Sequence, residues 1–266
     1  MLPFDPSTIK KDDLDGIGVG LSSIVVHVKD SNSVVKTFPP LDKDQDAERR
    51  IYEHLQRDNG HPNILKYFGR CPAEYELLRS GLAFEYHPRG TLLASVDKLD
   101  AIGVSESDRQ RWPHQIVSAM DFIHSRGVIH GDIGLHNLLI HNDGGIVLCD
   151  FAGSGMEGLL PTIGAGVRYS DPQRSDNLYS TKDDDIFALG TVLYELGSMK
   201  RLFEGQSSQY IYRHLRDREF PDLSTVPLPL RGLISKCWSL PGYQASDALV
   251  DMGMFHIVQK ALRTSS

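Results

Sequence analysis

The apolar positions in the first part of the chain come in short runs separated by turn residues, a pattern that predicts β-strands. Three such runs, at residues 16–29, 33–38 and 81–86, are rich in valine, isoleucine and other apolar residues. Residues 30–32 (Asp-Ser-Asn) lie between the first two runs and predict a hairpin connection. One helix is predicted among these strands, at about residues 44–57, because its apolar side chains recur at helical spacing.

Beyond residue 88 the pattern becomes helical. A helix is predicted to begin at Ser105, with Asp108 three residues later as a capping partner, and to end at Arg126 and Gly127. Pro113 is expected either to kink this helix or to lie in its first turns. The apolar face of the helix consists of Trp112, Ile116, Met120 and Ile123. Further helices are predicted near residues 184–197, 209–217, 230–238 and 246–262.

These patterns predict an α+β fold in two lobes. Residues 1–87 would form a small antiparallel-sheet lobe with one helix, and residues 88–266 a larger helical lobe, with a hinge near residues 85–90. A chain of 266 residues, of which 40% are hydrophobic, is long enough for two lobes that share a cleft.

Charge and cysteine content narrow the classes of partner and compartment. The formal net charge of −7 argues against a nucleic-acid binder, which needs a basic face. The apolar runs are far shorter than the ~20 residues of a membrane-spanning helix, and the N-terminus lacks the apolar region of a secretory signal. Three widely spaced cysteines, Cys71, Cys149 and Cys237, indicate a reducing compartment. We therefore expect a soluble cytoplasmic domain without nucleic-acid or membrane partners.

Two features of the first lobe are suited to binding phosphate groups. Gly18 and Gly20 lie between strand-like runs, where backbone amides could approach phosphates and the following Val25 could cover a nucleobase. An ordinary hairpin turn is the alternative. Lys36 ends a β-branched run and Glu48 lies on the predicted helix, so that the carboxylate could hold the lysine toward phosphate oxygens. A solvated lysine on an edge strand is the alternative here.

The most specific pattern lies in the second lobe. Asn137 follows Asp132 by five residues, and Asp150 follows a predicted buried strand. Phosphoryl transfer needs a carboxylate that orients the attacking hydroxyl and oxygen ligands that hold Mg²⁺ against the phosphates. The pattern predicts the first of these functions for Asp132 and the second for Asn137 and Asp150. Two surface turns that carry these residue types by chance are the alternative.

With these motifs, the chain resembles the eukaryotic-type protein kinase family from about residue 16 to residue 262, and in its short, divergent form it is similar to kinase-like proteins of filamentous fungi. The resemblance implies a two-lobed kinase fold that binds ATP and Mg²⁺ between the lobes. Further motifs that carry it are residues 61–64 (His-Pro-Asn-Ile), 84–87 (Phe-Glu-Tyr-His), 150–151 (Asp-Phe), 169–172 (Tyr-Ser-Asp-Pro), 185–190 (Asp-Ile-Phe-Ala-Leu-Gly) and 237–238 (Cys-Trp).

The resemblance also implies site residues. Lys36, held by Glu48, would contact the α and β phosphates, Asp132 would be the catalytic aspartate, and Asn137 and Asp150 would be the metal ligands. Residues expected to surround the nucleotide are Gly18, Gly20, Val25, Val34, Leu139 and the main chain of Glu85 and His87. Residues expected to stack behind the site are Tyr52, His130 and Phe151.

The catalytic loop departs from the family pattern at several positions. The arginine expected before Asp132 is Gly131, so activation by phosphorylation of the following loop is not expected. The lysine of serine/threonine kinases is Gly134, and the arginine of tyrosine kinases is His136. The usual cation beside the phosphoryl group is therefore missing, unless protonated His136 or a displaced Arg168 replaces it.

Two further departures look linked. Gln173 stands where the family has a glutamate, and Gln244 stands where its buried arginine partner is expected. Replacing both members of a buried ion pair can be nearly neutral, whereas removing one leaves an uncompensated charge.

Three functions fit these residues. The first is an ATP-dependent protein kinase that acts on an unidentified protein, with Ser/Thr favoured as the acceptor. Its activity would be reduced by the residues missing from the catalytic loop, and it would act as a monomer or in transient complexes. The second is an ATP-binding pseudokinase or scaffold, suggested by four residues in place of the expected ones: Gly131, Gly134, Ala152 and Gly166. The third is a small-molecule phosphotransferase of the aminoglycoside or choline type, because those enzymes also place Gly between His and Asp.

Overall fold

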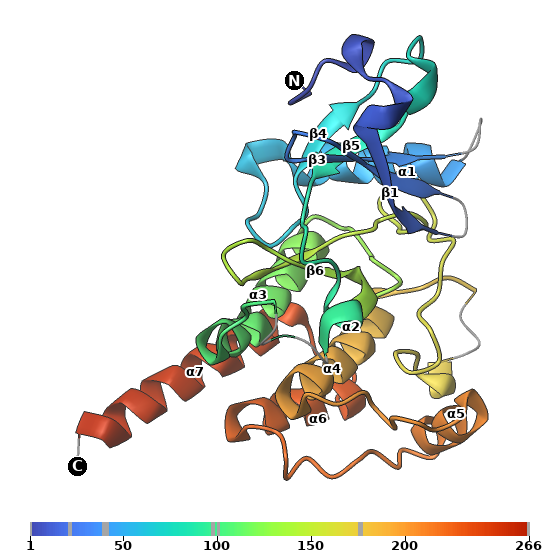
Figure 1. The fold of residues 1–266 in the computed structure, drawn as a ribbon. Helices are drawn as coiled ribbons and strands as arrows, with labels where there is room; N and C mark the ends of the chain where they lie inside the picture. Colours follow the sequence, from blue (N-terminus) through green and yellow to red (C-terminus); the bar gives the residue numbers. More distant parts are fainter. Residues whose placement is uncertain are drawn as a thin grey trace.

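The computed structural model of the chain describes residues 2–20, 23–38, 43–96, 99, 102–174 and 178–264, and for residues 43–44 and 255–264 it describes the backbone. Figure 1 shows a sheet-rich part built from the first third of the chain and a mainly helical part built from the rest. The predicted α+β fold is therefore confirmed.

A five-stranded antiparallel sheet dominates the first part, with strand order β1-β2-β3-β5-β4. The strands are β1 Leu14–Val19, β2 Ile24–Val28, β3 Ser33–Thr37, β4 Tyr67–Arg70 and β5 Leu82–Glu85. The predicted hairpin between β2 and β3 is present, and Asp30 turns the chain with a φ of 57°, a left-handed conformation that aspartate tolerates. The sequence pattern did not predict β4, whose four residues include Gly69 and a shift in register.

Each face of this sheet is covered by a different segment. On one face lies helix α1, Lys43–Leu55, whose buried Ile51, Tyr52 and Leu55 belong to the main core. On the other face the N-terminal residues pack against a separate small core. The N-terminal side chains are Leu2, Phe4, Ile9 and Leu14, and the small core consists of Val28, Val35, Cys71, Leu78 and Ala83.

The helical part contains α2 Leu92–Ser95, α3 Glu106–Ser125, α4 Lys182–Ser198, α5 Ser208–Arg216, α6 Leu228–Ser239 and α7 Ala245–Thr264, with a small sheet of β6 Leu138–Ile140 and β7 Ile146–Leu148. Short 3-10 turns lie at Pro6–Thr8, Lys11–Asp13, Arg57–Asn59, Glu76–Leu78, Leu135–Asn137 and Pro172–Arg174. No helix in the described part of the chain combines the length and apolar character needed to cross a membrane. All three cysteines are buried and unpaired.

Local sequence explains the ends of α3. The Ser105 hydroxyl accepts the Asp108 N–H, and the Asp108 carboxylate accepts the Ser105 N–H, which forms the predicted capping box. The helix ends at Arg126, and Gly127 follows with a φ of 72°, as expected for a glycine stop. Pro113 lies in the interior of the helix, which continues to Ser125.

Helix α4 lies at the centre of the helical part, and its residues 185–196 are all buried. Gly190 allows α6 to approach closely, because a Cβ atom at this position would lie 2.8 Å from the Cβ of Cys237. This close packing holds the beginning of α4 beneath the catalytic loop, where Asp185 contacts the backbone.

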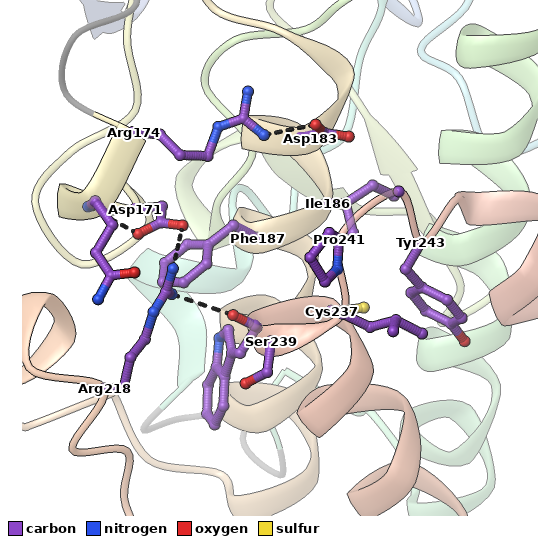
Figure 2. A pocket seen from close by; sticks show the side chains of 14 residues that line it. Asp171, Arg174, Asp183, Ile186, Phe187, Arg218, Cys237, Ser239, Pro241 and Tyr243 are labelled. Carbon is purple, nitrogen blue, oxygen red and sulfur yellow. Dashed lines mark hydrogen bonds and ion pairs between the residues drawn. The ribbon is translucent and has the colours of Figure 1, made fainter.

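Gln173 and Gln244 replace the two members of an ion pair that the family pattern leads one to expect, and a different ion pair lies nearby. The Gln173 side chain donates to the carbonyl oxygen of Arg216, and the Gln244 N–H donates to Asp247. Arg218 instead pairs with Asp171 at 2.8 Å, and it also donates to the carbonyl oxygen of Trp238 (Figure 2). Both Arg218 and Asp171 line a pocket of about 250 Å³ between α4 and the end of α6. A charge pair therefore persists here, supplied by other residues.

Replacing Arg218 by Met is expected to lower the free energy of unfolding by about 1–3 kcal/mol, because the Asp171 side chain is only 6% exposed and would lose its cation. Urea denaturation measures the change. The matched control is Arg216→Met, which removes the exposed pair with Asp217 and should cost less than about 0.5 kcal/mol. Equal effects of the two variants would contradict this assignment.

Candidate active site

The carboxylates of Glu48 and Asp150 meet at the ammonium group of Lys36. The Lys36 ammonium on β3 lies 2.9 Å from the Glu48 carboxylate on α1 and 2.7 Å from the Asp150 carboxylate, which follows β7. Lys36 and Glu48 are almost wholly buried, whereas the Asp150 side chain is 45% exposed. The structure thus brings together these three predicted residues, and Asp150 remains accessible to a ligand.

Burial and charge act in opposite directions on this cluster. Burial opposes the charge on Lys36, but attraction to Glu48 and Asp150 outweighs it and raises the lysine pKa well above its usual value. Burial raises the pKa of Glu48 to about 7, although Lys36 opposes that change. The pKa of Asp150 is lowered, because its contacts with Lys36 overcome the effect of burial. Lys36 is therefore a permanent cation at this site.

The backbone of Asp150 has a φ of 64°, in the left-handed region that few residues other than glycine occupy. Its carboxylate accepts the N–H of Ala152 at 3.3 Å, a local bond of the kind that lets aspartate adopt this conformation. The strained turn directs the carboxylate toward Lys36.

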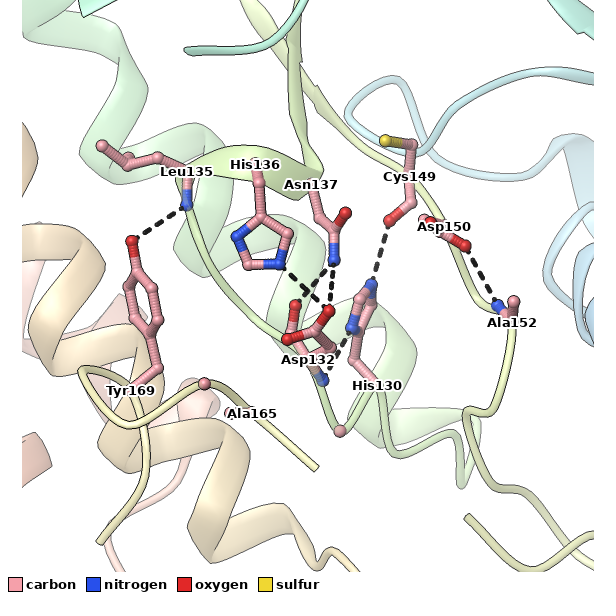
Figure 3. A network of polar contacts seen from close by, with 12 residues as sticks. His130, Asp132, Leu135, His136, Asn137, Cys149, Asp150, Ala152, Ala165 and Tyr169 are labelled. Carbon is pink, nitrogen blue, oxygen red and sulfur yellow. Dashed lines mark hydrogen bonds and ion pairs between the residues drawn. The ribbon is translucent and has the colours of Figure 1, made fainter. Parts of the chain in front are cut away.

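His130 links the catalytic loop to the segment that carries Asp150. Its Nε2 donates to the carbonyl oxygen of Cys149 at 3.0 Å, and its Nδ1 accepts the Asp132 N–H at 3.2 Å (Figure 3). These two bonds define which ring nitrogen carries the proton. The centroid of the His130 ring also lies 4.9 Å from that of Phe151, at a tilted angle, and the Phe151 centroid lies 5.0 Å from that of Tyr52, edge to face. The three rings are thus in contact, as predicted, but they are not stacked face to face.

A buried carboxylate holds the backbone of the catalytic loop. Asp185 accepts the N–H groups of His130 and Gly131, each at 2.8 Å. Gly131 has a φ of 81°, and a Cβ atom there would lie 3.2 Å from the carbonyl oxygen of Ile163. The glycine found instead of arginine thus suits both the backbone conformation and the closely packed loop.

Asp132 and Asn137 lie side by side in this loop. The Asn137 side-chain amide donates to the Asp132 carbonyl oxygen at 2.8 Å and to its carboxylate at 3.2 Å. The amide oxygen of Asn137 is then the atom that could bind a metal. His136 lies in the 3-10 turn Leu135–Asn137, which directly precedes β6. Its Nε2 also contacts the Asp132 carboxylate, at 3.0 Å.

The donor set suits Mg²⁺ held jointly by protein, phosphates and water. No group of three or more His, Cys, Asp or Glu side chains that could hold a metal occurs among the described residues. Mg²⁺ needs only one or two protein oxygen ligands when substrate phosphates and water supply the rest. The Asn137 amide oxygen and the Asp150 carboxylate fit this requirement.

Three of the residues predicted around the nucleotide belong to, or pack against, the core that the two parts share. Val34 is buried in the main core, and Val25 and Leu139 pack against that core. Gly18 lies on β1 opposite Val25, and the Gly20 N–H donates to the carbonyl oxygen of Ser23, while residues 21 and 22 lie outside the described residues.

The segment after β5 contains a feature that the sequence did not reveal. The side chain of His87 is only 1% exposed, and neither ring nitrogen has a hydrogen-bond partner among the described residues. Burial lowers its pKa to about 4, although the nearby Glu85 and Asp143 favour protonation and His141 opposes it. The sequence had indicated only the main chain of His87 as functional, because no local sequence pattern marks a buried imidazole that lacks a hydrogen bond from the described residues.

Comparison with known proteins gives one family. The family described as Protein kinase domain matches residues 12–244. The chain is 26% identical over 209 residues to CBL-interacting protein kinase 31 of Oryza sativa subsp. japonica, covering 74% of this chain and 45% of that protein. It is 28% identical over 186 residues to Serine/threonine/tyrosine-protein kinase HT1 of Arabidopsis thaliana (67% and 46%), and 29% identical over 194 residues to Aurora kinase A-A of Xenopus laevis (71% and 45%).

The fold, the Lys36 cluster and the match over residues 12–244 define the class: this chain belongs to the protein kinase family. The predicted family is thereby confirmed, and its members generally use ATP and Mg²⁺. The comparisons favour neither the scaffold nor the small-molecule alternative. The chain spans slightly less than half the length of these curated relatives.

Stability at acid pH is expected to depend on His87. Because the pKa of His87 in the folded protein, about 4, lies below the ordinary 6.5, the folded state resists protonation and loses stability as the pH falls from about 6.5 toward 4. Between pH 7 and pH 5 this loss amounts to about 2 kcal/mol. Urea denaturation of His87→Leu should show a smaller decrease over this range than the wild type. Parallel pH profiles would contradict the assignment.

Proposed function

We propose that this chain transfers the γ-phosphoryl group of ATP to a serine or threonine hydroxyl of a protein. The observation that carries the proposal is the cluster in which Lys36 contacts both Glu48 and Asp150, with Asp132 and Asn137 paired in the catalytic loop. This combination supplies a fixed cation for phosphates, oxygen ligands for a metal and a carboxylate for the attacking hydroxyl.

Each side chain has a distinct task in this mechanism. Lys36, held by Glu48, binds phosphate oxygens of ATP, and the Asp132 carboxylate accepts a hydrogen bond from the substrate hydroxyl and orients it for attack. Asn137 and Asp150 would hold Mg²⁺, which when bound neutralises charge on the phosphates. The Asp150 carboxylate is paired with Lys36. When a nucleotide binds, Lys36 would therefore also contact the phosphates, and Asp150 would also contact the metal.

The nucleotide base would lie between Val25 and Val34 on one side and Leu139 on the other, against the main chain of Glu85 and His87. Gly18 and Gly20 would cover the phosphates. We further propose that residues 1–87 and 88–266 act as the two lobes around the nucleotide.

The preference for serine or threonine rests on relatives. One is named CBL-interacting serine/threonine-protein kinase 3, and the name of another includes tyrosine as well. We propose that the substrate is an unidentified protein and that this chain acts on it as a monomer or in transient complexes. A cytoplasmic location agrees with the three unpaired cysteines.

Asp132→Asn tests the catalytic assignment. The substitution keeps the size of the side chain but weakens its ability to accept the hydroxyl proton, and it should lower phosphate transfer from γ-labelled ATP by ~10²–10⁴-fold. The assay measures label on the protein itself and on casein, a generic acceptor, with Mg²⁺ present. Wild-type protein that binds ATP but transfers no more label than Asp132→Asn would contradict the proposed function.

Lys36→Met tests the nucleotide assignment independently of transfer. ATP and Mg²⁺ at about 100 times the dissociation constant should stabilise the wild type by about 2.7 kcal/mol, and the variant should lose this increment. The comparison is made with and without ATP for each protein, because removal of Lys36 also leaves Glu48 buried without its cation. An undiminished ATP-dependent increase in melting temperature would refute the placement of Lys36 at the phosphates.

A further inference from the structure

The imidazole of His136 contacts the carboxylate proposed to be catalytic. His136 Nε2 lies 3.0 Å from Oδ2 of Asp132, and because a carboxylate only accepts, Nε2 is the donor. The Asn137 amide donates to the same oxygen at 3.2 Å. The other carboxylate oxygen, Oδ1, has no hydrogen bond from the described residues. Two donors on Oδ2 thus fix the rotation of the carboxylate and leave Oδ1 for a substrate hydroxyl.

Gly134 provides the space that the imidazole occupies. A Cβ atom at Gly134 would lie 2.5 Å from Cε1 and 2.7 Å from Nδ1 of His136. The φ of Gly134 is −178°, an extended conformation open to any residue, so the backbone does not require glycine here. The requirement is steric, and it couples residue 134 to the position of the His136 ring.

Tyr169 forms a side wall for this ring. Their ring centroids lie 6.1 Å apart, and the Tyr169 hydroxyl donates to the buried Glu195 at 2.7 Å. The same hydroxyl accepts the N–H of Leu135, the residue before His136. Arg168, the other candidate for a cation near Asp132, instead donates to the carbonyl oxygen of Leu202 at 2.7 Å. Of the two candidate cations, His136 and Arg168, His136 is therefore the one whose side chain contacts Asp132.

We propose that His136 is a positioning residue for Asp132 and that Gly134 and His136 work as a pair. The proposal rests on the proposed function, because it assigns the carboxylate of Asp132 to the substrate hydroxyl. Loss of the Nε2 donor would free the carboxylate to rotate, and the attacking hydroxyl would then be less well oriented.

The first test removes the donor and then restores it. His136→Leu should lower kcat for phosphate transfer to casein ~10–100-fold, while KM for ATP and the melting temperature stay close to the wild-type values. His136→Gln, whose terminal amide can donate from a similar position, should retain kcat within a few-fold. His114→Leu, at an exposed histidine on α3, is the matched control and should leave kcat unchanged.

The second test uses the space beside the ring. Gly134→Ala should displace the imidazole and lower kcat as His136→Leu does. Little change in melting temperature is expected, because the two atoms within 3 Å of the new Cβ belong to the end of the His136 side chain, and Cε2 of Tyr169 is next at 3.1 Å. In a His136→Ala background the same change should cause no further loss.

The outcomes separate this inference from the proposed function. Unchanged kcat in His136→Leu, failure of His136→Gln to retain activity, or additive losses for Gly134→Ala and His136→Ala would overturn the inference alone, given an active wild type. A wild type that binds ATP without transferring phosphate would overturn the proposed function and this inference with it.

Discussion

The geometry of the catalytic loop depends on one buried carboxylate. Asp185, 1% exposed at the beginning of α4, accepts two consecutive backbone N–H groups, from His130 and Gly131, and contacts His124 Nε2 at 3.0 Å. A buried carboxylate without these donors would be costly, so the loop and the helix stabilise one another. Asp132 follows directly, and its position therefore derives from the packing of α4 in the core.

The departures from the family pattern have local physical reasons in this loop. Gly131 adopts a positive φ beneath Ile163, and Gly134 leaves room for the ring of His136. Neither glycine creates an open space, because other side chains or backbone occupy the volume in both cases. The catalytic loop is thus differently packed, with the charged cluster around Lys36 intact.

Local patterns were sufficient to predict much of this fold. The cap at Ser105 and apolar periodicity placed α3, and periodicity alone placed α4, each to within about two residues. The β-branched run at residues 33–38 placed β3, whereas the run at 16–29 covers both β1 and β2. The strand and helix positions of Lys36 and Glu48 suggested that they meet, and the family resemblance favoured this contact over a solvated lysine. Contacts between distant segments were not predictable: Arg218 and Asp171 are 47 residues apart. The spacing of four positions from Asp132 to His136 was visible in the sequence, but the direction of the His136 ring depends on Gly134 and Tyr169.

The central claim is that this divergent loop still performs phosphoryl transfer. A single-turnover experiment tests it most directly, with wild-type protein in excess over γ-labelled ATP and Mg²⁺, followed by hydrolysis of the protein and identification of the labelled amino acid. The account predicts that the label moves from ATP to phosphoserine or phosphothreonine. ATP that remains bound and intact throughout the time course would contradict it.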